Sequence, residues 1–219
     1  MKKILFILLA GVLLLGMTAC GSMTEEKVMT EEKVMTEEKV MTGERAMTPK
    51  FENCVFMGDS ITEGFSINEL LKNEQILAGA GATAGFSYED IDALVERKPN
   101  QVFLMLGSDD ILMPVEDPKE LFLTDYTKLV KKIKEELPKA KIYLQSITPV
   151  TEEALKLEPR YENIEEYNGV IQGIAKELDV NYVEIDTIAK ENPDLFAEDG
   201  VHFKKEFYQL WLEMLSKVF

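Results

Sequence analysis

The chain has 219 residues, of which 46% are hydrophobic and 29% charged, a composition typical of one globular domain with appendages rather than of a fibrous or disordered protein. Its formal net charge is -16, and the first 50 residues carry equal numbers of acidic and basic side chains, so the whole excess lies after residue 50. So acidic a domain, without a run rich in Lys and Arg, excludes nucleic acid as a partner and repels anionic membrane surfaces.

Residues 1–19 have the pattern of a secretion signal. Lys2 and Lys3 precede an apolar run at 4–15, and small residues at 17–19 lead to Cys20. The apolar run is too short for an ordinary spanning helix, which needs about 20 residues. The segment resembles the lipobox of bacterial lipoproteins, with Met17 where Leu is usual. That resemblance implies a palmitate-type lipid on Cys20 and an extracytoplasmic, membrane-anchored protein, at the cell surface or on the periplasmic face. Plain secretion and a retained apolar anchor are the alternatives.

Residues 20–50 are expected to form a disordered tether. The hexapeptide MTEEKV occurs at 23–28, 29–34 and 35–40, and a diverged copy, MTGERA, follows at 41–46. A period of six matches neither the coiled-coil nor the helix repeat, so Val and Met form no continuous apolar stripe. A segment with so little apolar surface is expected to stay unfolded. A specific binding repeat is the alternative.

Residues 51–219 alternate short apolar runs with helical patterns, which indicates a parallel sheet covered by helices. We predict strands at 54–57, 75–78, 101–106, 141–146 and 181–185. The expected fold is a three-layer α/β/α sandwich around a mostly five-stranded parallel sheet. Cys54, inside the first strand, is expected to be a small buried residue.

Four helices are predicted between and after these strands. Ser87 and Asp90 resemble a capping box that starts the first of them. The next spans 124–137 and is followed by Pro138, and a third spans 164–178. The last, at 204–219, carries an aromatic stripe whose spacing indicates core packing.

Ser60 follows the first predicted strand, in the run Gly58-Asp59-Ser60, and directly precedes a helical pattern. Ligands of open parallel sheets bind at the carboxyl ends of strands, so a serine here is a candidate nucleophile. Thr62 occupies the position that Gly takes in the G-x-S-x-G elbow, so that motif is absent. A turn with a helix cap is the structural alternative.

The single histidine, His202, is the candidate base for such a serine. It lies in the run Asp199-Gly200-Val201-His202, before the last predicted helix. A carboxylate three residues earlier can hold one ring nitrogen and fix the tautomer.

Together these segments resemble the SGNH, or GDSL-type, hydrolases, a family with a flavodoxin-like fold. The resemblance covers residues 51–219 and implies that Ser60, Asp199 and His202 form a catalytic triad. It also implies an oxyanion hole lined by the Ser60 N–H, a glycine and an asparagine. Gly85 is the best match for the glycine, and Gly81 is the alternative. Asn168, after the fourth strand, also matches a family position.

Asp109 departs from the family pattern, because Gly107-Ser108-Asp109-Asp110 stands where the family has Gly-x-Asn-Asp. Asp109 therefore replaces the asparagine that donates to the oxyanion in the family. Loss of one such donor lowers the rate by about 10² to 10³, and an ionised carboxylate would also repel the oxyanion. A fast enzyme therefore needs Asp109 protonated, turned away, or replaced in its role by Ser108 or water.

These residues predict a serine esterase that cleaves a carboxylic ester through an acyl-enzyme. Small acyl groups, such as acetyl on a carbohydrate, are favoured because no long apolar insertion is present to form a lipase lid. A catalytically weak lipoprotein that binds a glycan or a partner through the same cleft is one alternative, and an acyltransferase is another. No cofactor or metal site is expected, because the chain lacks a cluster of ligating residues.

Overall fold

The computed structural model describes residues 48–218. The predicted signal sequence at 1–19, the lipid-attachment residue Cys20 and the tether up to residue 47 lie outside the described residues. A short 3-10 helix, η1 (Thr48–Phe51), leads into the domain and includes the last three residues of the predicted tether. Within 48–218 no helix has the length and apolar character needed to cross a membrane.

A five-stranded parallel sheet forms the centre of the domain, in the order β2-β1-β3-β4-β5. The strands are β1 (Cys54–Gly58), β2 (Ile76–Ala78), β3 (Gln101–Met105), β4 (Lys141–Gln145) and β5 (Asn181–Val183). The five predicted strands are confirmed, with ends that differ by one or two residues. The strand order is that of doubly wound, flavodoxin-like sheets, as predicted.

Helices cover both faces of the sheet. They are α2 (Ser60–Ile67), α3 (Ala84–Ser87), α4 (Ile91–Arg97), α5 (Pro118–Glu136), α6 (Glu152–Leu157), α7 (Ile164–Glu177), α8 (Asp186–Glu191) and α9 (Lys205–Leu215). Five further 3-10 turns are η2 (Asn73–Gln75), η3 (Tyr88–Asp90), η4 (Asp110–Leu112), η5 (Pro159–Asn163) and η6 (Pro193–Leu195).

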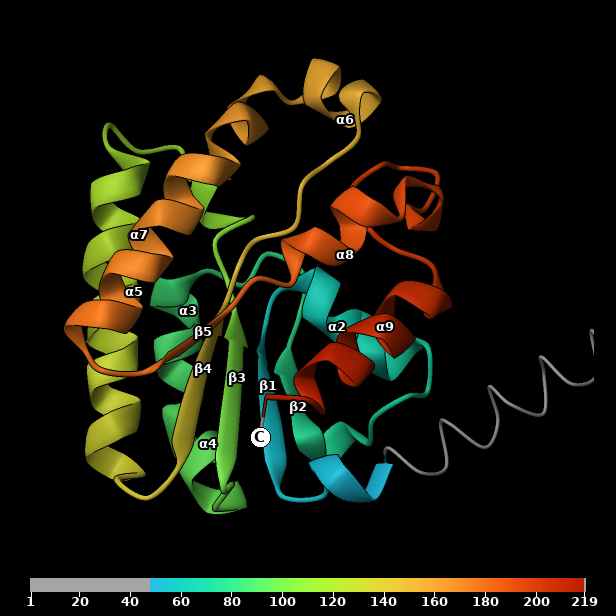
Figure 1. Cartoon of the computed structure of the whole chain (residues 1–219). Helices are drawn as coiled ribbons and strands as arrows, with labels where there is room; N and C mark the ends of the chain where they lie inside the picture. Colours follow the sequence, from blue (N-terminus) through green and yellow to red (C-terminus); the bar gives the residue numbers. More distant parts are fainter. Residues whose placement is uncertain (1–47, 219) are drawn as a thin grey trace, which may run out of the picture. The chain divides into compact units, whose positions relative to one another are not determined.

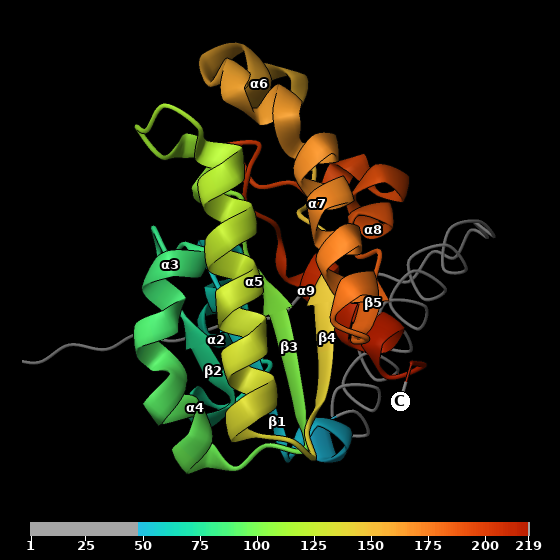
Figure 2. The same cartoon turned by 90° about the vertical axis from the view of Figure 1, so that its left-hand side faces the viewer.

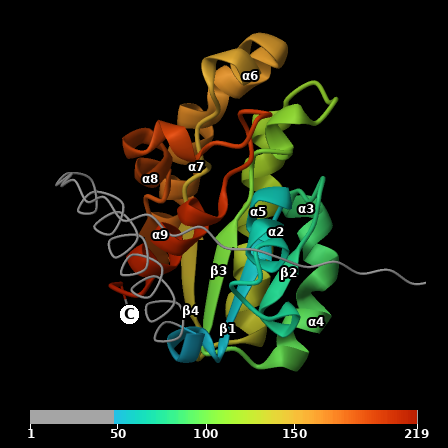
Figure 3. The ribbon, with the colours of Figure 1, turned by 90° about the vertical axis from the view of Figure 1, so that its right-hand side faces the viewer.

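The two faces hold separate hydrophobic cores, which produces the predicted three layers. Figure 1 shows α3, α4, α5 and α7 on one side of the sheet and α2, α8 and α9 on the other; Figures 2 and 3 view these two sides. Successive residues of β1 point to opposite faces, so Met57 belongs to the core that contains Leu129 of α5. Phe56 belongs to the other core, where its ring contacts Phe65 of α2 and which also contains Trp211 of α9. Hydrophobic side chains on both faces of every central strand explain why the strands are continuous apolar runs in the sequence.

The aromatic stripe of α9 lies in the core, as predicted, although the helix ends at Leu215 rather than at the predicted residue 219. Phe207, Tyr208 and Trp211 are at most 1% exposed, and the Trp211 Nε1–H donates to Gln145 Oε1 at 2.7 Å. Cys54 is also buried, at 4% exposure.

Two helix starts differ from the prediction. The helix predicted at 124–137 begins at Pro118, because Asp117 caps it by accepting the Glu120 N–H and Pro118 fits the first turn. The capping box at Ser87 is wrong. The chain is already helical at Ser87, and Thr83 supplies the cap by accepting the Phe86 N–H.

The chain reverses its direction of winding at β1, which pairs with β2 on one side and β3 on the other. The carboxyl ends of β1 and β3 therefore border the crevice where ligands bind in such sheets. Ser60 follows β1 and Asp109 follows β3, so the topology places both at this crevice.

Two helical glycines provide a matched test of this packing. A Cβ added to Gly64 would lie 2.0 Å from the Tyr208 hydroxyl oxygen, whereas one added to Gly169 would meet nothing within 4 Å. Because Tyr208 is buried and fixed by its aromatic neighbours, we expect Gly64→Ala to lower the free energy of unfolding by about 1–3 kcal/mol. Gly169→Ala should leave it unchanged or raise it by up to about 1 kcal/mol. Urea unfolding checks both, and equal effects would contradict the packing described.

Candidate active site

Ser60 is the first residue of α2 and directly follows the turn that ends β1. The turn requires glycine, because a Cβ on Gly58 would lie 2.1 Å from Thr62 Oγ1 and 2.5 Å from the Met105 carbonyl oxygen. Asp59 caps the helix by accepting the Ile61 N–H at 2.9 Å. The Ser60 N–H therefore lies at the positive end of α2, and the Ser60 side chain is half-buried.

Asp199 and His202 belong to a tight loop before α9. Asp199 Oδ1 accepts the backbone N–H groups of Val201 and His202, both at 2.9 Å, and Oδ2 lies 2.7 Å from His202 Nδ1. Gly200 has φ of +71°, and a Cβ there would lie 2.1 Å from Thr151 Oγ1, so glycine is needed. The carboxylate thus fixes both the loop and the imidazole.

Hydrogen bonds join the three side chains in one line, since Ser60 Oγ lies 2.8 Å from His202 Nε2. Burial alone would raise the pKa of Asp199, but hydrogen bonds from Val201 and His202 outweigh it and lower the pKa to about 2. An ionised Asp199 only accepts, so His202 Nδ1 carries the proton and Nε2 is left to accept the Ser60 hydroxyl. This is the arrangement that removes a proton from a serine.

Asp109 lies beside this line of residues, at the start of η4. Burial raises the pKa of its carboxyl group, while a hydrogen bond from the Gly81 backbone and the nearby His202 lower it; the balance is a raised pKa. The side chain is therefore neutral over a wider pH range than an exposed aspartate. In the structure, the Asp109 carboxyl group accepts the Gly81 backbone N–H.

Gly81 and Gly85, the two glycines considered from the sequence, lie in different surroundings. Gly81 has φ of +79° in the loop after β2 and faces Asp109. Gly85 lies inside α3, where an added Cβ would be 2.7 Å from Asp125 Oδ2 of α5. The structure therefore brings Gly81, and not Gly85, together with Asp109, because α3 begins at Ala84 and turns Gly85 toward α5.

The buried carboxyl groups of Asp59 and Asp110 hold the loops around Asp109, although the sequence motifs indicate no role for either. Asp59 accepts a hydrogen bond from the Ser108 hydroxyl group. That proton is therefore not free to bind the oxyanion, the role that the sequence left open for Ser108. Asp110 accepts the Ala84 N–H at 3.0 Å and so anchors the start of α3. Burial raises the pKa of Asp59 to about 6 and that of Asp110 to about 7. In the sequence, only their positions next to Ser60 and Asp109 could have indicated this role.

Asn168 fixes the strand end behind the Asp109 turn. Its side-chain amide accepts the Ile147 N–H at 2.7 Å and donates to the Ile147 carbonyl at 3.1 Å. The Ile147 side chain in turn fills the space beside Gly107, where a Cβ would lie 2.4 Å from Ile147 Cδ1. Gly107 has φ of +130°, which glycine adopts readily. Asn168 therefore supports the turn that presents Asp109, through Ile147.

Known proteins resemble the domain both in sequence and in fold. The sequence model of the GDSL-like lipase/acylhydrolase family matches residues 56–210. The fold is similar to that of a GDSL-like lipase from Bacteroides thetaiotaomicron, with a TM-score of 0.61 and 19% identity over 83% of this chain and 95% of that one. It is also similar to an acetylxylan esterase from Geobacillus stearothermophilus, with a TM-score of 0.54 and 17% identity over 75% of this chain and 92% of that one. No curated protein matches the sequence.

Proposed function

Because the chain belongs to the GDSL-like lipase/acylhydrolase family, we propose that it is a serine esterase that hydrolyses a carboxylic ester through an acyl-enzyme. The observation that carries this proposal is the line of hydrogen bonds from Ser60 through His202 to Asp199. All three residues lie within the part of the chain that matches the family.

In the first half-reaction, Ser60 Oγ attacks the ester carbonyl carbon while His202 Nε2 takes the hydroxyl proton. The carbonyl electron pair moves to the oxygen, and Asp199 stabilises the imidazolium that forms. When the pair returns, the bond to the alcohol breaks and His202 gives the proton to the leaving oxygen. Water then repeats these steps on the acyl-enzyme, with His202 again as base and then acid, and releases the carboxylic acid.

In this proposal the oxyanion is held by the Ser60 N–H, by a neutral Asp109 and by the Gly81 N–H, which turns from the Asp109 carboxyl group to the substrate oxygen. Gly81 takes this role in place of Gly85, because Gly81 lies beside Asp109 and Gly85 faces α5. An ionised Asp109 at about 4 Å would raise the energy of the oxyanion by about 4 kcal/mol at an effective dielectric constant of about 20. A protonated Asp109 donates a hydrogen bond instead, and burial of its carboxyl group favours that form.

The substrate class is a small acyl ester, with acetyl groups on a carbohydrate as the specific proposal. The similarity to an acetylxylan esterase supports it, as does the acidity of the domain, which disfavours anionic substrates.

The enzyme is proposed to act outside the cytoplasm, anchored by a lipid on Cys20 after removal of residues 1–19. This proposal rests on the apolar run at 4–15, the Ala19-Cys20 pair after it, and the MTEEKV repeats that would act as a spacer. Mass spectrometry of the protein extracted from membranes would find a lipid-modified Cys20 at its N-terminus.

Replacement of Ser60 tests the proposed reaction. We expect Ser60→Ala to abolish hydrolysis of p-nitrophenyl acetate, because the acyl-enzyme can no longer form. Ser66→Ala is the matched control, because Ser66 lies at the other end of α2. Among the residues that the structure describes, its hydroxyl group donates to Asn73 Oδ1 and to no group of the active site. Equal activity in the wild type and in Ser60→Ala would refute the proposal.

Replacement of Asp109 tests the neutral donor. The pKa of Asp109 is raised, so the carboxyl group loses its proton as the pH rises through that pKa, and the wild type should then lose activity. Asp109→Asn keeps a donor at every pH. We therefore expect the ratio of wild-type to variant kcat/KM to fall with rising pH, by up to about 10² to 10³ between about pH 4 and pH 9.

A constant ratio would contradict the role given to Asp109. If neither protein hydrolyses any ester, the result favours a lipoprotein that binds glycan through the same cleft.

A further inference from the structure

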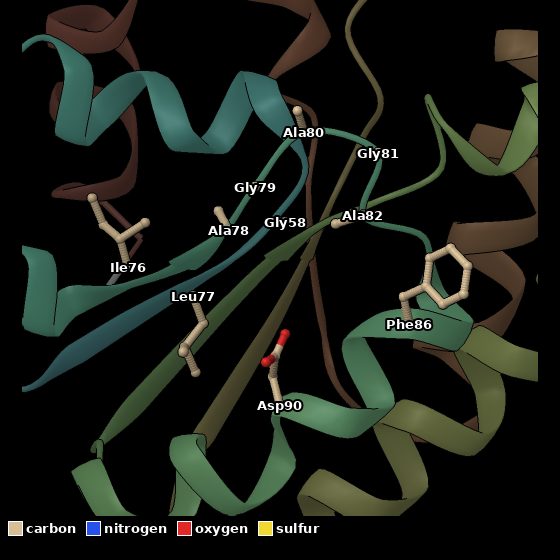
Figure 4. Close-up of a pocket in the computed structure, with 10 residues that line it drawn as sticks. All are labelled: Gly58, Ile76, Leu77, Ala78, Gly79, Ala80, Gly81, Ala82, Phe86 and Asp90. Carbon is tan, nitrogen blue, oxygen red and sulfur yellow. The ribbon is translucent and has the colours of Figure 1, made fainter.

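A pocket of about 400 Å³ lies at the edge of the sheet, beside β2 and the loop that follows it. Figure 4 shows the Leu77 side chain and the Asp90 carboxylate on one side of the loop and the Phe86 ring at its far end. No step of the proposed reaction uses this pocket.

The pocket adjoins the active site through two shared residues. Gly58 lines it and precedes Ser60 by two residues, a distance of at most about 7 Å along the chain. Gly81 lines it too, and its backbone faces Asp109. A group joined to an ester at Ser60 can therefore extend directly into the pocket.

The walls of the pocket combine backbone groups with one aromatic ring. Positions 78–82 are all Ala or Gly, and a Cβ at Gly79 or Gly81 would meet nothing within 4 Å, so the backbone there is open to a ligand. β2 is the edge strand of the sheet. Phe86 is 62% exposed, so the face of its ring is open to a ligand in the pocket.

This chemistry suits a neutral ring that carries hydroxyl groups. The aromatic face of Phe86 can pack on the C–H face of such a ring, while Asp90 and the backbone groups hydrogen-bond to hydroxyls. An anionic group would be repelled by Asp90, and a long acyl chain would find only Leu77, Ile76 and Phe86 as large apolar partners.

We propose that this pocket is the subsite for the sugar ring on the alcohol side of the scissile ester, with Phe86 as the stacking residue and Asp90 as the hydroxyl-binding residue. This inference rests on the proposed esterase function and specifies its substrate. After acyl transfer to Ser60, the deacetylated sugar leaves through this pocket, which opens at the sheet edge.

Two ester substrates separate the pocket from the reaction itself. An acetylated xylooligosaccharide fills the pocket, whereas ethyl acetate has an alcohol too small to reach it, and a pH-stat measures hydrolysis of both. We expect Phe86→Ala to lower the ratio of kcat/KM for the sugar ester to kcat/KM for ethyl acetate by about tenfold, and Asp90→Asn to lower it by a similar factor.

Ile67→Ala and Asp92→Asn are the matched controls. Ile67 is exposed at the other end of α2, and Asp92 is exposed two residues from Asp90 without lining the pocket. Both should leave the ratio at the wild-type value. Binding of the same oligosaccharide to Ser60→Ala gives a second readout without turnover, and Phe86→Ala in that background should weaken it by about tenfold.

An unchanged ratio in Phe86→Ala and Asp90→Asn, together with unchanged binding in the Ser60→Ala background, would overturn the sugar subsite and leave the esterase proposal intact. A selective loss of activity toward longer acyl chains in Phe86→Ala would also overturn it, since the pocket would then hold the acyl group. A wild type that hydrolyses neither ester refutes the esterase function itself.

Discussion

One hydrogen bond, 2.8 Å long, joins Ser60 Oγ to His202 Nε2 across 142 residues of sequence, and the site forms only if both ends are held. At one end, Gly58 allows β1 to turn directly into α2. At the other, Asp199 accepts two backbone N–H groups of its own loop before it binds the imidazole. Gly58 and the Asp199 loop therefore fix the positions of Ser60 and His202, and the sheet brings both to the carboxyl ends of its strands.

Three buried or half-buried carboxyl groups lie at the carboxyl ends of the strands beside Ser60, and their protonation depends on pH. Asp59, Asp109 and Asp110 all have pKa values raised by burial, and each also hydrogen-bonds to a neighbouring loop. Burial disfavours the ionised form of each carboxyl group, whereas the hydrogen bonds that each accepts from a neighbouring loop favour it. For Asp109, the raised pKa favours the neutral form that the proposed oxyanion role requires.

The sheet and the aromatic helix α9 could be predicted because their signals are local: continuous apolar runs for buried parallel strands, and a 3.6-residue aromatic stripe. The triad residues could be proposed because their motifs are short and rigid. The surroundings of Gly81 and Gly85 could not, because they depend on Asp109 and Asp125, which are distant in sequence. The Ser87 cap failed for a similar reason, since Asp110 binds the Ala84 N–H and Thr83 begins the helix earlier.

The central claim is that His202 activates Ser60, and a fluorophosphonate probe tests it most directly, because the probe reacts with activated serines. Mass spectrometry of the labelled wild type should find one modified residue, Ser60, in stoichiometric yield, and labelling should be lost in His202→Ala. Modification of another serine, or equal labelling of the wild type and His202→Ala, would contradict the account.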